Sequence, residues 1–287
     1  MKKERLPSWM HRSFLQQEEI GYVKQMLSAH SLKSVCEEAH CPNRSECYAK
    51  KRATFLALGH FCTRSCAFCH ITHSHPSAPD PQEGENIADL AQKLKLKHVV
   101  VTMVTRDDLS DGGSAHMAMI VRAIRKKTRA SIEVLTSDFS GNLSHLDFLL
   151  REEIAIFNHN VETVRSLTPK IRSSAQYERS LSLLHHAKHS SFRGKVKSGL
   201  MVGLGETKAE VMQTLCDLHA VGCDMVTIGQ YLQPSKKQMQ VQAFIPPETF
   251  KEYEAYGLAL GIPQVIAAPF VRSSYSAEEL FCVGKKK

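Results

Sequence analysis

Apolar residues along the chain alternate between helical spacing and short uninterrupted runs. Ile87, Leu90 and Leu94 share one helical face, and the apolar run 98–102 that follows is typical of a buried parallel strand. The same alternation continues towards the C-terminus. Strands are predicted at 54–58, 98–102, 131–136, 153–158, 195–202, 224–229 and 264–268, and helices at 82–94, 114–127, 143–150, 175–188, 208–220 and 247–260.

Regular strand–helix alternation implies a parallel sheet with right-handed crossovers. An open six-unit barrel and a doubly wound sheet both fit this pattern, and both put the working site at the C-terminal ends of the strands. The sequence therefore predicts an α/β fold, a partial (β/α)6 TIM-like barrel. Its core is expected at 54–231, with an N-terminal extension at 1–53 and a C-terminal extension at 232–287.

Composition narrows the class of protein. The chain has 287 residues, of which 43% are hydrophobic, and no apolar run reaches the ~20 residues that span a bilayer. The basic N-terminus lacks an apolar segment behind it, so we expect no secretory signal and a cytoplasmic location. The net charge of +8 suggests an acidic partner, but Lys and Arg are spread along the chain. The sequence therefore predicts neither a nucleic-acid nor a membrane partner.

The cysteines are the most informative residues. There are nine, an odd number without an export signal, which argues against a disulfide framework. Six of them form two triplets with short spacings, Cys36-x4-Cys41-x5-Cys47 and Cys62-x3-Cys66-x2-Cys69. The second triplet directly follows the first predicted strand, at the mouth of the sheet.

Each triplet offers three thiolates, whereas a structural zinc ion takes four ligands. A 4Fe–4S cluster held by three thiolates keeps one iron open to chelate a substrate. Zinc stays an alternative, because Cys66 and Cys69 with His70, His73 and His75 also offer a mixed site, and the chain would then be a zinc module binding nucleic acid. Phe68 either packs in the core or stacks on a bound adenine.

Cys62-x3-Cys66-x-Phe68-Cys69 resembles the signature of radical S-adenosylmethionine enzymes. The earlier triplet, Cys36-x4-Cys41-x5-Cys47, resembles that of the lipoyl synthase family. The similarity runs almost end to end and includes 59–69, 105–113, 157–163, 199–207, 227–235 and the closing motif 272–277. The stretch 236–239 departs from the family pattern.

This resemblance implies S-adenosylmethionine and two 4Fe–4S clusters as cofactors. Cys62, Cys66 and Cys69 would hold the cluster that reductively cleaves S-adenosylmethionine. An auxiliary cluster would be held by Cys36, Cys41, Cys47 and Ser274. The implied reaction is the radical insertion of two sulfur atoms at carbons 6 and 8 of a protein-bound octanoyl group. The auxiliary cluster would be the sulfur donor, and no acid–base catalytic residue is expected.

Further cofactor contacts are expected where predicted strands end. Asp111, Gly112 and Gly113 follow the second strand, where position and resemblance favour cofactor binding over a simple turn. Site-facing and helix-capping roles are both open for Asn158, Asn160 and Glu162. Gln230 and Tyr231 are expected to line a substrate channel. Core positions are expected for Met201, Met225, Cys216, Cys223 and Cys282.

The resemblance also implies partners. The substrate would be an octanoylated lipoyl carrier domain, on a dehydrogenase acyltransferase subunit or on the glycine cleavage H protein. Such carriers are typically acidic, so the +8 charge would steer them to the site. A flavodoxin or ferredoxin-type reductant and an iron–sulfur carrier protein would serve the clusters. The alternative function is that of another radical S-adenosylmethionine enzyme with an auxiliary cluster.

Overall fold

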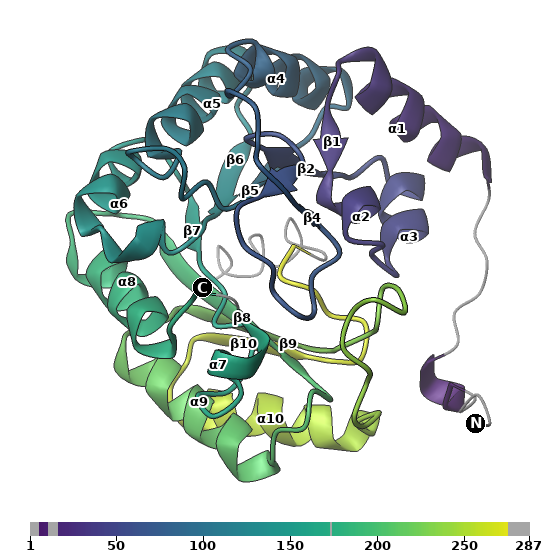
Figure 1. Cartoon of the computed structure of the whole chain (residues 1–287), viewed down its shortest axis with the longest axis vertical. Coiled ribbons are helices and arrows are strands. Elements are labelled where there is room, and N and C mark those ends of the chain that lie inside the picture. The colour runs from purple at the N-terminus through teal and green to yellow at the C-terminus, as the bar shows by residue number, and fades with distance from the viewer. Residues whose placement is uncertain (1–5, 11–16, 173, 275–287) are drawn as a thin grey trace.

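The fold is built on one curved, mostly parallel sheet (Figure 1). The computed structural model describes residues 6–10, 17–172 and 174–274. Eight strands hydrogen-bond in the order β1-β2-β5-β6-β7-β8-β9-β10, and the sheet is open between β1 and β10. Their bounds are β1 Lys33–Ser34, β2 Thr54–Ala57, β5 His98–Met103, β6 Ser131–Leu135, β7 Ile156–Asn158, β8 Lys195–Val202, β9 Met225–Gln230 and β10 Gln264–Ala267.

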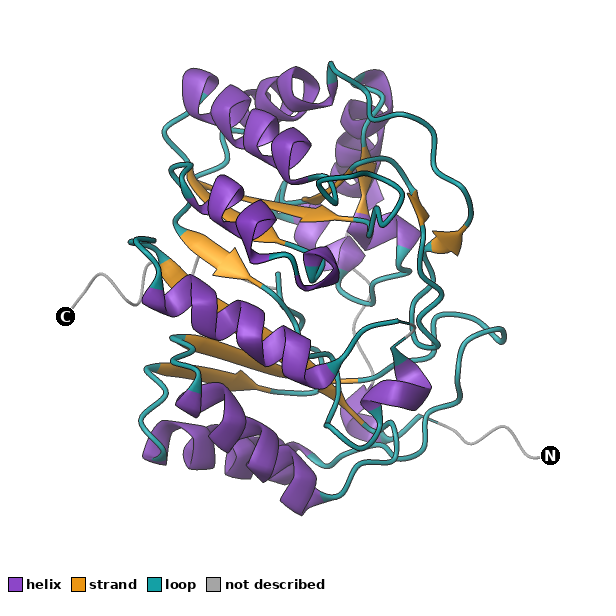
Figure 2. Cartoon of the chain, turned by 60° about the vertical axis from the view of Figure 1, so that its left-hand side comes forward, coloured by secondary structure: helices purple, strands orange, loops and turns teal. Residues whose placement is uncertain are grey.

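From β2 to β10 every neighbouring pair is parallel and follows sequence order. A doubly wound sheet would reverse its strand order at a switch point, and no reversal occurs here. The prediction of a partial TIM-like barrel is therefore confirmed. Helices cover the outer face of the sheet (Figure 2). They are α4 Glu83–Lys93, α5 Ser114–Lys127, α6 Leu143–Leu150, α8 Tyr177–His189, α9 Lys208–Ala220 and α10 Pro247–Ala259, with a short α7 at Thr168–Ile171.

The core sits between the strands and this outer ring of helices. All six side chains of β5 are buried, as expected of a strand covered on both faces. Ile87 and Leu90 on α4 are fully buried, which confirms the predicted apolar face. The predicted strand 153–158 is shorter than expected, because β7 pairs with β6 over three positions only.

The segment before β2 contains structure that the apolar pattern did not predict. Three helices, α1 Gln17–Ala29, α2 Val35–Glu38 and α3 Arg44–Ala49, surround the short strand β1. β1 pairs antiparallel with β2, Lys33 opposite Leu56. Tyr48 on α3 is fully buried, and its hydroxyl lies 2.5 Å from Ser34 Oγ. These contacts fix the first cysteine triplet to the edge of the sheet.

The chain after β10 turns back towards the inside of the barrel. Ala268 N donates to Ile228 O, and Gln230 N donates to Pro269 O. At Gly229 an added Cβ would lie 2.0 Å from Val271 O, so only glycine allows this close approach to β9. This closing segment, residues 268–274, is thereby held against the C-terminal end of β9. Two 3-10 turns, Ser8–Met10 and Phe139–Gly141, and a two-stranded pair of β3 (Phe61–Cys62) with β4 (Thr72–His73) complete the described elements. No helix of the described residues is long and apolar enough to cross a membrane.

Candidate active site

A cavity of about 320 Å³ opens at the C-terminal ends of the strands. Its walls come from the segments that follow β2, β5, β6, β7, β9 and β10, from the end of β8, and from the N-terminal helices. All three cysteines of the second triplet line it, as do Cys36 and Cys41 of the first triplet. The structure therefore brings the two triplets, 15 positions apart at their closest in sequence, to one cavity.

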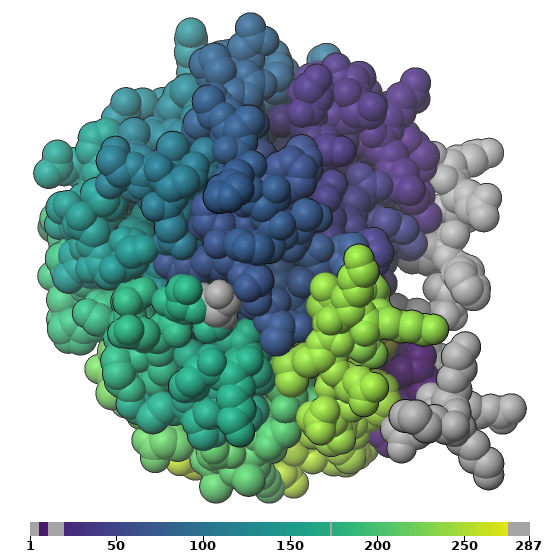
Figure 3. All heavy atoms as spheres, viewed as in Figure 1, coloured from purple at the N-terminus to yellow at the C-terminus, as the bar shows by residue number. Residues whose placement is uncertain are grey.

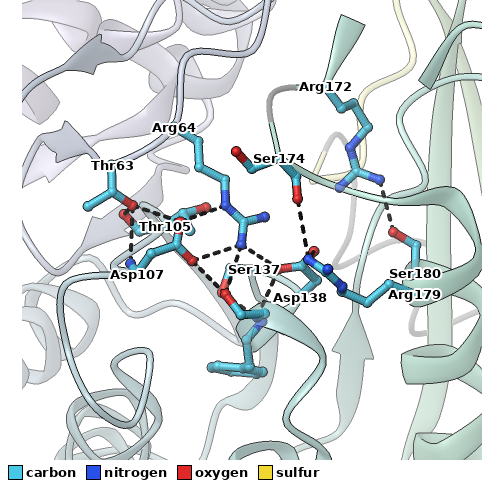
Figure 4. Close-up of polar contacts among 12 residues, drawn as sticks. Thr63, Arg64, Thr105, Asp107, Ser137, Asp138, Arg172, Ser174, Arg179 and Ser180 are labelled. Carbon is cyan, nitrogen blue, oxygen red and sulfur yellow. Dashed lines mark hydrogen bonds and ion pairs between the residues drawn. The ribbon is translucent and has the colours of Figure 1, made fainter. Parts of the chain in front are cut away.

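The loop of the second triplet is anchored by Arg64, between Cys62 and Cys66 (Figure 4). The Arg64 guanidinium donates to both carboxylate oxygens of Asp107, at 2.7 and 2.8 Å. It also lies 2.8 Å from Asp138, whose side chain is fully buried. Burial alone would raise the pKa of Asp138, but Arg64 outweighs it and lowers that pKa to about 2. The carboxylates beyond β5 and β6 therefore hold the cysteine loop over the strand ends.

The first triplet and Ser274 line a smaller cavity of about 50 Å³ next to the large one. Cys36 lies on α2, Cys47 on α3, and Cys41 in the turn between these helices. The closing segment reaches them because the Asn43 amide donates to Phe270 O at 2.7 Å. Three thiols and one hydroxyl thus line one cavity.

The donor chemistry of both cavities fits an iron–sulfur cluster. All six triplet cysteines are free thiols. Burial, and then the neighbouring Cys41 thiolate, raise the pKa of Cys36 to about 12 and that of Cys47 to about 11. Burial likewise raises the pKa of Cys69 to about 12. Buried thiols that would repel one another as thiolates ionise when a cationic metal centre binds them.

Unpartnered polar atoms at both cavities also point to a missing ligand. Asn43 Oδ1 and Asn160 Oδ1 are buried without a hydrogen-bond partner among the described residues. Within those residues no three His, Cys, Asp or Glu side chains converge as ligands of a single metal ion.

Two histidines join the triplets. His40, before Cys41, stacks on His70, after Cys69, with ring centroids 3.8 Å apart. His70 Nδ1 lies 2.8 Å from Glu38 O. The loop after β9 closes over the same region, since Met239 N donates to Ala67 O. Figure 3 shows this yellow-green loop in contact with the blue segment that follows β2.

The polar wall of the large cavity includes Asn160 and Glu162, just beyond β7. Asn160 Nδ2 donates to Glu162 Oε1 at 3.1 Å. Burial raises the pKa of Glu162, and Arg172 partly offsets this. Burial also lowers the pKa of His159 to about 4, so the imidazole is neutral at pH 7. The wall thus combines an acceptor carboxylate, amide groups and the buried Arg172.

Other predicted residues lie elsewhere. The Asp111 carboxylate accepts from Gly113 N and from Ala115 N in the first turn of α5, and Gly112 and Gly113 have φ of 60° and 87°. None of 111–113 is among the residues lining the large cavity. Their contacts are those of a turn, and cofactor binding there stays a prediction.

Asn158 is fully buried and donates to Glu133 inside the barrel. Phe68 and Tyr231 line the large cavity, but the Gln230 side chain instead holds the following loop through Ala243 O and Ile245 N. Met201, predicted as a core residue, also lines the cavity, because it lies near the C-terminal end of β8.

Met225 and Cys223 are buried as predicted. Cys216 is half-buried beside the Tyr256 hydroxyl, and Cys282 is outside the described residues.

Sequence reasoning missed Arg64, Asp138, His159 and Arg172. The positions of Asp138 and His159 just after strands were the available signal, whereas Arg172 follows a short helix and offered none.

Comparison with known proteins identifies the class. The model of the radical SAM superfamily matches residues 56–218. The fold is similar to that of SuiB from Streptococcus suis, with a TM-score of 0.57 at 9% identity, over 79% of this chain and 52% of that one. Fold, cysteine loop and family match together define a radical SAM enzyme. Membership implies S-adenosylmethionine and a 4Fe–4S cluster as cofactors.

Curated relatives resolve the family. The chain is 52% identical to a lipoyl synthase of Protochlamydia amoebophila, over 95% of this chain and 86% of the relative. It is 45% identical to a lipoyl synthase of Alkaliphilus metalliredigens, over 97% of both chains. The chain belongs to the lipoyl synthase family.

Proposed function

We propose that this chain inserts sulfur at carbons 6 and 8 of an octanoyl group carried on a lysine of an acidic carrier protein. The observation that carries the proposal is that both cysteine triplets and Ser274 line two neighbouring cavities, which share Cys36, Cys41 and Ser274 in their walls. A reaction that brings a radical and a sulfur donor to one alkyl chain needs two such centres side by side.

Cys62, Cys66 and Cys69 would hold one 4Fe–4S cluster, and Cys36, Cys41, Cys47 and Ser274 a second one. When bound, the first cluster with S-adenosylmethionine supplies a 5′-deoxyadenosyl radical, and the second supplies sulfide. Ser274 offers a hard oxygen ligand to a soft iron, which favours a corner that opens readily.

The chain's own residues bind, orient and exclude water. Asn160, Glu162 and Arg172 offer amide, carboxylate and guanidinium groups to the polar end of S-adenosylmethionine. Phe68 offers an aromatic face to its adenine. Met201 and Tyr231 add apolar wall to the cavity, which shields a carbon radical from water. A contribution of Asn158 would be indirect, through the barrel interior, and one from Asp111, Gly112 and Gly113 would act through the start of α5.

Carrier docking is supported by charge at the mouth. Lys236 and Lys237 are exposed, two and three positions beyond Pro234, which lines the cavity. Exposed cations there would steer an acidic carrier. We further propose a cytoplasmic enzyme that takes electrons from a flavodoxin or ferredoxin-type protein and receives replacement clusters from an iron–sulfur carrier.

The test is anaerobic loading with iron and sulfide, followed by turnover with an octanoyl-lysine carrier peptide, S-adenosylmethionine and a reductant. Two 4Fe–4S clusters per chain, 5′-deoxyadenosine and a thiolated octanoyl product are expected. Replacing all three first-triplet cysteines by alanine is expected to keep 5′-deoxyadenosine formation and abolish thiolation. Replacing the second triplet is expected to abolish both.

Cys216→Ala with Cys223→Ala is the matched control, because these thiols lie outside both cavities. Two clusters and 5′-deoxyadenosine without thiolation would contradict the proposed substrate and favour another radical SAM reaction. Zinc in place of iron after anaerobic loading would contradict the cluster assignment.

A further inference from the structure

A buried group of polar side chains fills the barrel interior below the active-site cavity. Lys197 on β8 and Glu133 on β6 are both fully buried. Lys197 Nζ donates to Glu133 Oε1 at 2.9 Å and to Oε2 at 3.2 Å. Asn158 on β7 donates to Glu133 Oε1 at 2.8 Å, and His98 on β5 lies 3.4 Å from Oε2. Four neighbouring strands therefore contribute to one network around a carboxylate.

Glu133 is held as a carboxylate in this network. Burial raises the pKa of Glu133, but Lys197 and His98 outweigh this and keep it below the usual range. Removing two charges from water carries a large desolvation cost, so well-packed apolar residues would stabilise this interior as well or better. The pair therefore calls for a role other than stability.

The third hydrogen bond of the Lys197 side chain indicates what this role is. Lys197 Nζ donates to the main-chain carbonyl of Ser273 at 2.5 Å. Asn160 Nδ2 lies 3.4 Å from Ser273 Oγ. All three ammonium donors are thus used, two inside the barrel and one on the closing segment. The neighbouring residue, Ser274, lines the first-triplet cavity.

We propose that Lys197 is a positioning residue that fixes the Ser273 carbonyl and thereby presents Ser274 to the auxiliary cluster. This inference rests on the proposed function, in which Ser274 is the fourth ligand. The hydrogen bond engages only the main chain of residue 273. The Ser274 hydroxyl can therefore leave an iron and return while the backbone stays in place, since Glu133 holds the lysine from behind.

The test uses chains in which Cys62, Cys66 and Cys69 are replaced by alanine, so that only the auxiliary cluster is loaded. A small thiol, 2-mercaptoethanol, is titrated while the cluster is followed by electron paramagnetic resonance and Mössbauer spectroscopy. If Ser274 occupies its iron in nine of ten molecules, 2-mercaptoethanol binds that iron with an apparent affinity about tenfold weaker than at an open site. Lys197→Met is expected to bind the thiol about tenfold more tightly than the parent, as Ser274→Ala does.

Lys197→Met leaves Glu133 buried and unpaired, so Lys197→Met with Glu133→Gln is made in parallel. The matched control is Lys208→Met with Glu252→Gln, which removes an exposed ion pair between α9 and α10. The control is expected to titrate like the parent. Tryptic cleavage after Arg272 in the loaded protein gives a second readout. It is expected to accelerate in both Lys197 variants and to be unchanged in the control.

A folded double variant that keeps the parental thiol response would overturn the positioning role and leave the proposed function intact. A parental response in Ser274→Ala would instead overturn the ligand assignment and the inference together. Thiolation activity, measured on the protein with both triplets intact, separates that outcome from failure of the proposed function. Loss of the folded protein in both Lys197 variants would make Lys197 a stability residue and would equally overturn the proposal.

Discussion

The side-chain amide of Asn43 donates a 2.7 Å hydrogen bond to the main-chain carbonyl of Phe270. These residues are 227 positions apart, and they join the turn of the first cysteine triplet to the segment that carries Ser274. This contact therefore closes the cavity lined by the first triplet and Ser274 from its two ends.

Asn43→Leu is expected to open that closure. The variant removes the buried amide that donates to Phe270 O, and the loss of this hydrogen bond costs about 0.5–1.5 kcal/mol of unfolding free energy. Urea denaturation measures the loss, and iron analysis is expected to show a preferential deficit at the first triplet. Gln92→Leu, which removes an exposed amide-to-carbonyl hydrogen bond to Lys127, is the control. Full iron content and unchanged stability in Asn43→Leu would contradict the closure.

Arg64→Leu is expected to destabilise the protein by about 1.5–3 kcal/mol, because the buried Asp138 carboxylate loses its partner at 2.8 Å and keeps only Arg179, at 3.2 Å. The same change releases the loop of the second triplet, so 5′-deoxyadenosine formation should fall in the protein that remains folded. Arg122→Leu removes an exposed arginine paired with Glu152 and is expected to change stability little. Equal effects of the two substitutions would show that Arg64 does not anchor the loop.

Gly229→Ala tests the close approach of the closing segment to β9. Its Cβ would lie 2.0 Å from Val271 O, so the backbone of one of the two segments must shift. We expect lower stability, faster tryptic cleavage after Arg272 and reduced iron at the first triplet. Gly21→Ala on α1, where an added Cβ meets nothing within 4 Å, is expected to stabilise by about 0.5–1 kcal/mol. An iron content in Gly229→Ala equal to that of Gly21→Ala would count against this packing.

His159 makes the free energy of unfolding depend on pH. Its pKa is lowered from 6.5 to about 4 by burial, so the unfolded chain binds its proton more readily than the folded one. Stability from this group is complete above pH 6.5 and is lost as the pH falls towards 4, by roughly 3 kcal/mol in all. Urea midpoints of the metal-free protein between pH 7 and pH 4 measure this loss. His159→Gln should flatten the profile over that range, and an unchanged slope would refute the assignment.

The alternating part of the fold could be predicted from the sequence, because each strand and helix there buries a face of regular period. The helices before β2 could not be predicted in this way. Their few apolar positions form a buried face only because Tyr48 and β1 pack against the sheet. The spacing of the cysteines predicted which thiols would lie close together. It did not indicate Arg64 or Arg172, whose roles come from partners 43 and 8 positions away.

Asn158 is the opposite case, a residue that the sequence placed among the candidates for the site and that lies outside the cavity. It follows the pattern of its neighbour Asn160, but its side chain points into the barrel network and not into the cavity. The direction of a side chain at the end of a short strand depends on pairing register, which local sequence does not reveal.

The closing segment also sets an order of events during biosynthesis. All six triplet cysteines leave the ribosome about 200 positions before Ser274. At about 5–20 residues per second, those thiols exist for roughly 10–40 s before their enclosure can be completed. The nascent chain therefore passes through a stage in which both triplets are complete and the segment that carries Ser274 has not yet been made. A metal centre inserted at the first triplet during that stage would lack the Ser274 hydroxyl that we propose as its fourth ligand, so its stable insertion belongs to the finished chain.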